Sequence, residues 1–333
     1  MNDLYRCTCL FIVVHQLRSV FISLILVMLV ASTVLVMASP NEKPTVVCTT
    51  TVLASIVEDL AGDLVNVEVI ASPTICPAHY DVRPSDVEKI RHASLILYHG
   101  FEPWIKDLVK ASGSEAPMVK VLGPWNTPKV LKDRYVAVAN ALRDYLGIDV
   151  SDRLDKCLKG IDEVDKWLKE YAEEHGFINT PVVSMLWQKA FITYLGFKVV
   201  AAFKPPEMVS AKEYSEVVEN ATKSGALLVI DNLQSGTELG KKVANEVGAI
   251  EVALTNFPKT APGLNNVTEV MKYNAKLLAD ALSQVKYVKE LTTEVGSLRT
   301  ELGLWRTLSI ASLVINVLLA ISVGLLVIKL RKR

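Results

Sequence analysis

Two long apolar runs bracket a chain that otherwise alternates short apolar segments with amphipathic ones. The runs cover residues 20–37 and 308–328. Between them, from residue 45, short β-branched segments alternate with stretches whose apolar residues recur every three or four positions. These two periodicities predict strands and helices in turn. Because such alternation is typical of parallel sheets covered by helices, the chain is predicted to be an α/β protein.

The predicted strands form two groups of four, separated by a long helical stretch. That stretch runs from about Pro128 to His175 and is interrupted near Gly147. Ser85–Glu88 and Ser210–Glu213 both have the pattern of a capping box, which opens a helix. The predicted strands are 45–50, 65–69, 95–98, 118–122, 181–185, 198–203, 226–230 and 250–255. The fold expected from this pattern is two parallel-sheet α/β lobes joined by a long connecting helix.

Both ends of the chain predict export and anchoring. Arg18 precedes the first apolar run and the small residue Ala38 ends it, as in a secretory signal. An uncleaved signal anchor is the alternative. The second run carries no charge and is long enough to cross about 30 Å of hydrocarbon as a transmembrane helix. Its basic tail favours the cytoplasmic side, so the bulk of the chain is expected to be extracytoplasmic, on a single-pass cell-membrane anchor.

A helical stalk is expected between the second lobe and the membrane. It carries an apolar repeat at three-four spacing: Val288, Leu291, Val295, Leu298, Leu302 and Trp305. The repeat covers fewer than three heptads, which is a weak signal for a coiled coil, so weak self-association through the stalk is an open alternative. The expected boundaries are signal peptide 1–38, N-terminal lobe 45–149, connecting helix 150–176, C-terminal lobe 177–286, stalk 287–307, transmembrane helix 308–328 and cytoplasmic tail 329–333.

Composition excludes some classes of function. The 36 basic and 36 acidic residues balance, whereas a nucleic-acid binder shows a basic excess, so no nucleic-acid partner is expected. The chain has no nucleophile elbow, Walker loop, GxGxxG or HExxH motif, and we expect no enzyme. Among five cysteines, Cys48 and Cys76 are candidates for a disulfide, which an exported protein can keep.

Polar residues at the ends of the predicted strands are the candidate site. In open α/β sheets, ligands bind beyond the carboxyl ends of the strands. Histidine is the commonest metal ligand, and carboxylates suit Zn²⁺ or Mn²⁺ as partners. The ordinary alternatives are a backbone-bonded or buried histidine and a capping or solvated carboxylate. The candidate metal ligands are His79, His99, Glu207 and Asp231, with Cys76, Met185, Gln188 and Asn256 as secondary ligands or cleft residues.

Three motifs at these positions are similar to a known family. They are Val47-Cys48-Thr49-Thr50-Thr51, the stretch from Val67-Glu68-Val69 to Pro84-Ser85-Asp86, and Leu97-Tyr98-His99-Gly100 with Glu102-Pro103-Trp104. Over about residues 46–256 the chain resembles the zinc/manganese solute-binding proteins of bacterial and archaeal ABC importers. That resemblance implies two α/β lobes, a rigid connecting helix and a metal ion between the lobes.

The family's metal site commonly uses three histidines and one carboxylate, and this chain departs from it. His79 matches the first histidine, but Gly123-Pro124-Trp125 occupies the place of the second. Met185 or Gln188 falls at the third, and Thr255 or Asn256 at the carboxylate. Asp231 lies where the family usually has a glutamate near the site. We therefore expect His99, Cys76, Glu207 or Asp231 to supply replacements.

The resemblance implies the extracytoplasmic solute-binding component of an ABC importer. It would capture Zn or Mn between its lobes and deliver the ion to a permease driven by a cytoplasmic ATPase. A binding protein for a non-metal solute is one alternative, with Trp104, Trp125 and Trp187 near strand ends as pocket walls. A surface adhesion or scaffold protein with an empty cleft and a hydrolase using the same cleft are the others.

Overall fold

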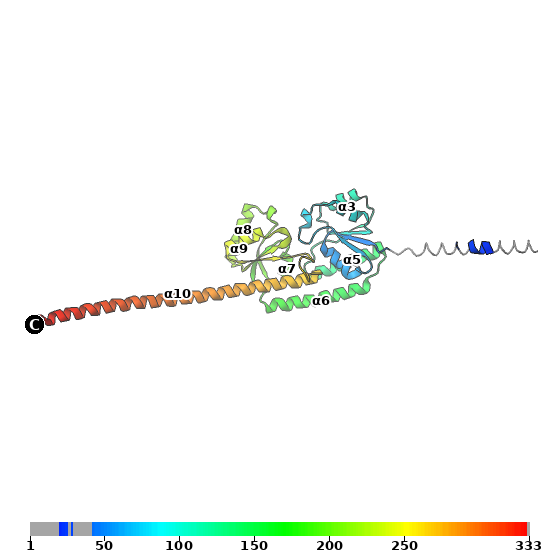
Figure 1. Ribbon diagram of the computed structural model, residues 1–333. Helices are drawn as coiled ribbons and strands as arrows, with labels where there is room; N and C mark the ends of the chain where they lie inside the picture. The colour runs from blue at the N-terminus through cyan, green and yellow to red at the C-terminus, as the bar shows by residue number, and fades with distance from the viewer. Residues whose placement is uncertain (1–19, 26–27, 29–41, 332–333) are drawn as a thin grey trace, which may run out of the picture. The chain divides into compact units, whose positions relative to one another are not determined.

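The computed structural model describes residues 20–25, 28 and 42–331. The chain divides after Lys43 into two parts. In the first part, residues 20–25 and 28 are helical, and the rest of the predicted signal peptide lies outside the described residues. The part from Pro44 onward holds both lobes and the long C-terminal helix (Figure 1).

The first lobe is a four-stranded parallel sheet in the order β2-β1-β3-β4. Alternate side chains of β1 serve opposite faces: Val46 and Cys48 pack towards helices α2 and α5, and Val47 towards α3 and α4. Strands buried on both faces need apolar residues at nearly every position, which explains the unbroken β-branched segments. The elements are β1 Thr45–Cys48, α2 Thr51–Ala61, β2 Asn66–Val69, α3 Pro84–Arg91, β3 Leu95–Tyr98, α4 Ile105–Ser112 and β4 Met118–Lys120.

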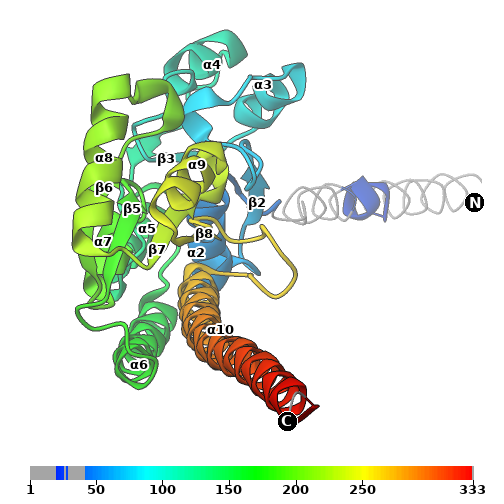
Figure 2. The same cartoon turned by 90° about the vertical axis from the view of Figure 1, so that its left-hand side faces the viewer.

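The second lobe repeats the topology of the first. Its parallel sheet has the order β6-β5-β7-β8, which is the same arrangement shifted by four strands. Helices α8 and α9 cover one face of this sheet (Figure 2). The elements are β5 Pro181–Met185, α7 Lys189–Tyr194, β6 Lys198–Phe203, α8 Ala211–Ser224, β7 Leu228–Asn232, α9 Glu238–Val247 and β8 Ile250–Leu254. The sequence prediction of two α/β lobes is confirmed.

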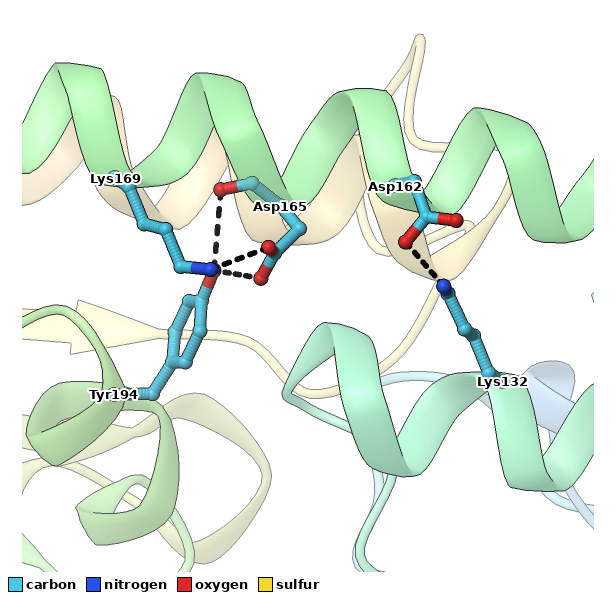
Figure 3. A network of polar contacts seen from close by, with 5 residues as sticks. All are labelled: Lys132, Asp162, Asp165, Lys169 and Tyr194. Atoms are coloured by element: carbon cyan, nitrogen blue, oxygen red, sulfur yellow. Dashed lines mark hydrogen bonds and ion pairs between the residues drawn. The ribbon is translucent and has the colours of Figure 1, made fainter.

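The connection between the lobes is α5, Pro128–Leu146, followed by α6, Ser151–Glu174. Gly147 separates them in the left-handed conformation with φ of 68°, which glycine adopts without a steric penalty. Polar contacts hold α6 to both sides (Figure 3). Lys132 of α5 pairs with Asp162, and Tyr194 of α7 donates to Asp165 Oδ1 at 2.7 Å. Helix α6 is thus attached both to α5 and to α7 of the second lobe.

The C-terminal helix α10 runs without a break from Val267 to Arg331. Its first turns, including Met271, Leu278 and Leu282, are buried against the lobes, whereas residues 286–331 are exposed on every side. The most apolar 18-residue window has a mean hydropathy of 2.6 and is 0% buried, so by length and composition α10 could cross a membrane.

Two local predictions are wrong. Ser85 does not cap α3 as expected, because the helix begins at Pro84 with Arg83 as the N-cap, and the Asp86 carboxylate accepts from the backbone N–H of Arg83 at 2.8 Å. Cys48 and Cys76 are both free. Cys48 is buried in β1, and Cys76 lies in the partly exposed loop after β2. The capping box at Ser210–Glu213 is confirmed.

Candidate functional site

Two short 3-10 turns carry the candidate ligands that approach each other from opposite lobes. One is η1, Pro77–His79, which follows β2, and the other is η2, Pro206–Met208, which follows β6. Both begin with proline, whose fixed φ suits the first position of a helical turn. His79 Nε2 lies 3.6 Å from Glu207 Oε1, with side chains 62% and 50% exposed. The pair is therefore open to solvent.

The turn that carries His79 is held by aromatic residues. The Trp104 indole N–H donates to the carbonyl of Pro77 at 2.7 Å. Trp104 also packs on Tyr80, with ring centroids 5.5 Å apart, and the Tyr80 hydroxyl donates to Asp86 at 2.9 Å. The backbone of His79 is thus fixed while its imidazole stays exposed.

The turn that carries Glu207 is held at the start of α8. Lys204 pairs with Glu213 at 2.8 Å, and Glu213 also accepts from the backbone N–H of Ser210 at 2.9 Å. The lysine and these hydrogen bonds lower the pKa of Glu213 to about 2. Glu213 stays ionised over the physiological range and fixes the turn beside it.

His99 is placed differently from His79. It is 2% exposed, its Nε2 lies 2.9 Å from Thr50 Oγ1, and its Nδ1 lies 2.9 Å from the carbonyl of Val121. Its ring stacks on Trp125 at 4.4 Å. Burial lowers the pKa of His99 to about 4, against the raising effect of Glu102. Both ring nitrogens are engaged, so His99 lies in the core as a neutral hydrogen-bonded side chain.

Asp231 is likewise buried, under helix α9. A Cβ on Gly240 would lie 1.9 Å from Asp231 Oδ2, so the helix contacts the carboxyl group closely and only glycine fits there. Neither carboxylate oxygen meets a donor within the described residues. Burial first, and then the charge of the neighbouring Glu251, raise the pKa of Asp231 to about 8. Asp231 is therefore held mainly in its protonated, neutral form at neutral pH.

Three buried amide side chains line the seam between the lobes: Asn126, Gln188 and Asn256. The amide nitrogens of both asparagines donate to the carbonyl of Trp187, at 3.0 and 3.5 Å, and that of Gln188 donates to the carbonyl of Leu254 at 3.4 Å. Rotating any of these amides would set oxygen against oxygen, so their orientation is fixed. Within the described residues their three carbonyl oxygens accept no hydrogen bond.

Further contacts close the seam. The Trp125 indole N–H donates to the carbonyl of Asn256 at 2.8 Å, and Gln234 donates to the carbonyl of Pro73 at 2.9 Å. Both bonds join one lobe to the other. Asn126 and Gln234 were not among the residues singled out in the sequence, because an asparagine before a helix and a glutamine in a loop carry no signal of burial.

Met185 and Cys76, which were also candidates from the sequence, lie outside the His79–Glu207 pair. Met185 is 1% exposed at the end of β5, and its sulfur accepts from the backbone N–H of Trp187 at 3.2 Å. Cys76 directly precedes η1. Over residues 20–25, 28 and 42–331, no three His, Cys, Asp or Glu side chains gather into a group that could hold a metal ion. The structure brings His79 and Glu207 together, and it surrounds His99 and Asp231 with separate buried neighbours.

Two α/β lobes of equal topology, joined by a helix and meeting at the carboxyl ends of their strands, define a two-lobed binding protein. The family model for the periplasmic zinc-uptake complex component A matches residues 46–281, more than half of the chain. The chain belongs to this family, whose members are solute-binding proteins of ABC importers rather than enzymes. The resemblance seen in the sequence is thereby confirmed.

Individual relatives match over shorter stretches. The manganese ABC transporter substrate-binding lipoprotein PsaA of Streptococcus pneumoniae is 32% identical over 103 residues, 29% of this chain and 33% of that protein. The metal ABC transporter substrate-binding lipoprotein SsaB of Streptococcus sanguinis is 32% identical over 84 residues, 23% of this chain. The chain spans 19%, 27% and 33% of three curated relatives that it matches, well under two thirds.

Solved structures share the fold. The periplasmic zinc-binding protein TroA of Treponema pallidum superposes with a TM-score of 0.63 at 18% identity, over 72% of this chain and 99% of that one. The Mn-bound periplasmic metal-binding protein of Candidatus Liberibacter asiaticus gives 0.63 at 16% identity, over 72% of this chain and 100% of that one. At such identities the likeness establishes the fold alone.

Proposed function

We propose that this protein captures a divalent metal ion, zinc or manganese, between its lobes and delivers it to an ABC permease served by a cytoplasmic ATPase. The observation that carries the proposal is the approach of His79 and Glu207, one from each lobe. An imidazole nitrogen and a carboxylate oxygen are ligands that both ions accept.

The spacing of this pair suits a shared ion. Two ligand atoms that each lie about 2.1 Å from a tetrahedral zinc ion stand about 3.4 Å apart. The Nε2–Oε1 distance of 3.6 Å is close to that separation. An ion bound there would have protein ligands from both lobes, and the exposure of the pair leaves room for water in the remaining positions. Metal binding would then couple directly to the relative placement of the lobes.

The test is thermal unfolding of the full chain in detergent, first chelated and then with Zn²⁺ or Mn²⁺ added singly. A ligand that binds only the folded state adds about 2.7 kcal/mol at a hundredfold excess over its dissociation constant. We expect one ion to raise the unfolding temperature in the wild-type protein, and His79→Ala and Glu207→Gln to abolish that rise.

The chain offers a matched control. Glu88 on α3 and His92, which directly follows the helix, form a pair of the same chemistry at 3.5 Å, but both residues belong to one lobe. His92→Ala should leave the metal response unchanged. A response that survives His79→Ala, or one that His92→Ala removes, would contradict the proposed site. No response to either ion in the wild-type protein would contradict metal capture itself.

The proposal includes the placement of the protein. The apolar segment of α10, residues 308–328, would cross the cell membrane once, with the basic tail in the cytoplasm and the lobes outside. The partners are then the permease, its ATPase and, through the stalk, a second copy of this chain. Protease treatment of intact cells should digest the lobes and spare a tag placed after Arg333.

A second candidate function is the binding of a small solute that carries hydrogen-bond donors. The three amide oxygens of Asn126, Gln188 and Asn256 favour it, because a buried acceptor without a donor costs about 1–3 kcal/mol. A solute that entered the seam could satisfy them. Mass spectrometry of the protein purified under native conditions would reveal a bound organic molecule, which metal capture does not predict.

A further inference from the structure

The exposed part of α10 before the predicted membrane segment has an apolar face that no other part of the described chain covers. Residues 287–307 would span about 30 Å as a helix. Six apolar side chains follow one another at spacings of three and four, and they are 41–70% exposed: Val288, Leu291, Val295, Leu298, Leu302 and Trp305. A continuous stripe of this kind on a lone helix leaves apolar surface in water, which association with another helix would bury.

The residue types on this stripe select a particular partner. In heptad notation the a positions are Val288, Val295 and Leu302, and the d positions are Leu291, Leu298 and Trp305. A β-branched residue at a with leucine at d favours parallel pairs of helices. The two heptads nearest the lobes have this combination. The occupant that the stripe favours is therefore one similar parallel helix.

The charges beside the stripe point to the same partner. Glu294 and Glu301 occupy g positions, and Arg299 and Arg306 occupy the e positions five residues further on. Five residues is too far for an ion pair on one helix, where neighbours are three or four apart. In a parallel in-register pair, however, each g position faces the following e position of the other helix. Both such contacts would join glutamate to arginine.

The stripe continues into the apolar segment, where its residues become small or polar. The next a and d positions are Ser309, Ser312 and Asn316, which keep the three-four spacing. Within hydrocarbon, helices associate through small residues and interhelical hydrogen bonds rather than through apolar burial. A lone asparagine in the bilayer is costly, and a second asparagine at the same depth would satisfy it. The same face thus offers in each environment the side chains that drive association there.

We propose that α10 pairs with α10 of a second copy of this chain, parallel and in register, from Val288 to Asn316. The pair presents two binding units side by side on one membrane. This inference rests on the anchored topology of the proposed function, because insertion of both copies in one direction makes the helices parallel. It is independent of metal binding, since His79 and Glu207 both come from a single copy.

The test is disulfide crosslinking of the full chain in native membranes. Leu298→Cys places a thiol at a d position, and we expect an oxidant to give a covalent dimer. Thr300→Cys, on the opposite face of the same helix, is the matched control and should give none. Crosslinking at both positions would show random collision, and crosslinking at neither would show no pairing, so either result overturns the proposal.

Exchanging the charges at the g and e positions tests the parallel in-register pairing of the two helices. In the Leu298→Cys background, Glu294→Arg with Glu301→Arg puts arginine against arginine, and Arg299→Glu with Arg306→Glu puts glutamate against glutamate. Each variant alone should lose the crosslink, and co-expression of the two should restore it. Failure of restoration contradicts the parallel in-register pair. The metal-induced rise in unfolding temperature, measured on the same variants, should stay unchanged, so loss of pairing and loss of metal capture are distinguishable.

Discussion

The two lobes have one topology and opposite chemistry at equivalent places. After the second strand, each has a proline-initiated turn, which carries His79 in the first lobe and Glu207 in the second. At the end of the third strand, each has a buried titratable group, His99 in the first lobe and Asp231 in the second. The exposed pair His79 and Glu207, which we call the mouth, therefore brings a histidine to a carboxylate. The same two residue types, His99 and Asp231, are buried in the interiors of separate lobes.

The difference in exposure between the mouth pair and the interior residues shows that the residue type alone does not make a metal site. His99 and Asp231 have the chemistry of metal ligands, yet burial holds both in their neutral forms. His79 and Glu207 have ordinary surface exposure and face each other. The interior groups should therefore govern stability and its pH dependence, whereas the mouth pair should govern binding.

The largest expected effect on stability is that of Trp125→Ala. The indole stacks on His99 of its own lobe, packs on Phe257 and donates to the carbonyl of Asn256. Its removal should cost about 3–5 kcal/mol, as for other buried aromatic side chains. Urea unfolding measures the loss. Trp187→Ala is the control, because that ring is 48% exposed and should cost much less. Equal losses would mean that the seam does not hold the lobes together.

The acid side of the stability profile should depend on His99. Its folded pKa of about 4 lies below the ordinary value, so the unfolded chain binds more protons between about pH 6.5 and 4. The contribution of His99 to stability should fall by up to about 3 kcal/mol as the pH drops through this range. Because Asp231 contributes a slope of opposite sign over the same range, the measurement is the difference in stability between the wild type and His99→Gln, which should shrink as the pH falls from 6.5 to 4, whereas the difference for His92→Gln, at an exposed site, should stay constant. A wild-type minus His99→Gln difference that does not change between pH 7 and 4 would contradict a buried neutral His99.

Asp231 should contribute a slope of the opposite sign between about pH 4 and 8. Its folded pKa of about 8 lies above the ordinary value of 3.8, so the folded state holds the extra proton and stability falls as the pH rises towards 8. Asp231→Asn should remove this slope and stabilise the protein at pH 9 by about 1–3 kcal/mol. Glu216→Gln, at an exposed carboxylate on α8, serves as the control. An Asp231→Asn variant less stable than the wild type at pH 9 would contradict the raised pKa of Asp231.

The smallest expected effect on stability is at the mouth. In chelated protein, His79→Ala and Glu207→Gln should each change the free energy of unfolding by less than about 0.5 kcal/mol, because both side chains are half exposed or more. Calorimetry of the chelated variants checks this. A large loss without metal would mean that the pair is a structural contact, and the comparison between mouth and interior would fail.

Much of the fold could be predicted from the sequence. Strands β3, β5 and β6 have the predicted bounds, and the break between α5 and α6 lies at Gly147. Strand β7 extends two residues further than predicted, to Asn232, because its pairing with β8 continues through Asp231 and Asn232. The prediction ended the strand at the polar side chains of Asp231 and Asn232. Pairing with a neighbouring strand, however, satisfies the backbone N–H and C=O groups whether the side chain is polar or apolar.

The site was harder to predict. The strand-end rule placed all four candidate ligands near the carboxyl edges of the sheets, and the ligand set stays a prediction. The rule could not distinguish the exposed His79 from the buried His99. The burial of His99 depends on Phe101 and Trp125, which stack on its ring. Nor could the rule find Asn126 and Gln234, whose partners lie 61 and 161 residues away in the chain.

The sequence by itself determined the alternation of strands and helices, the two lobes, the family and the heptad pattern of the stalk. These follow from periodicity and short motifs, which are local properties of the chain. Only the tertiary structure decided which histidine meets which carboxylate, which titratable groups are buried and which amide oxygens lack donors. Burial and contact between distant segments depend on packing across the seam, and packing is set by the shape of both lobes together.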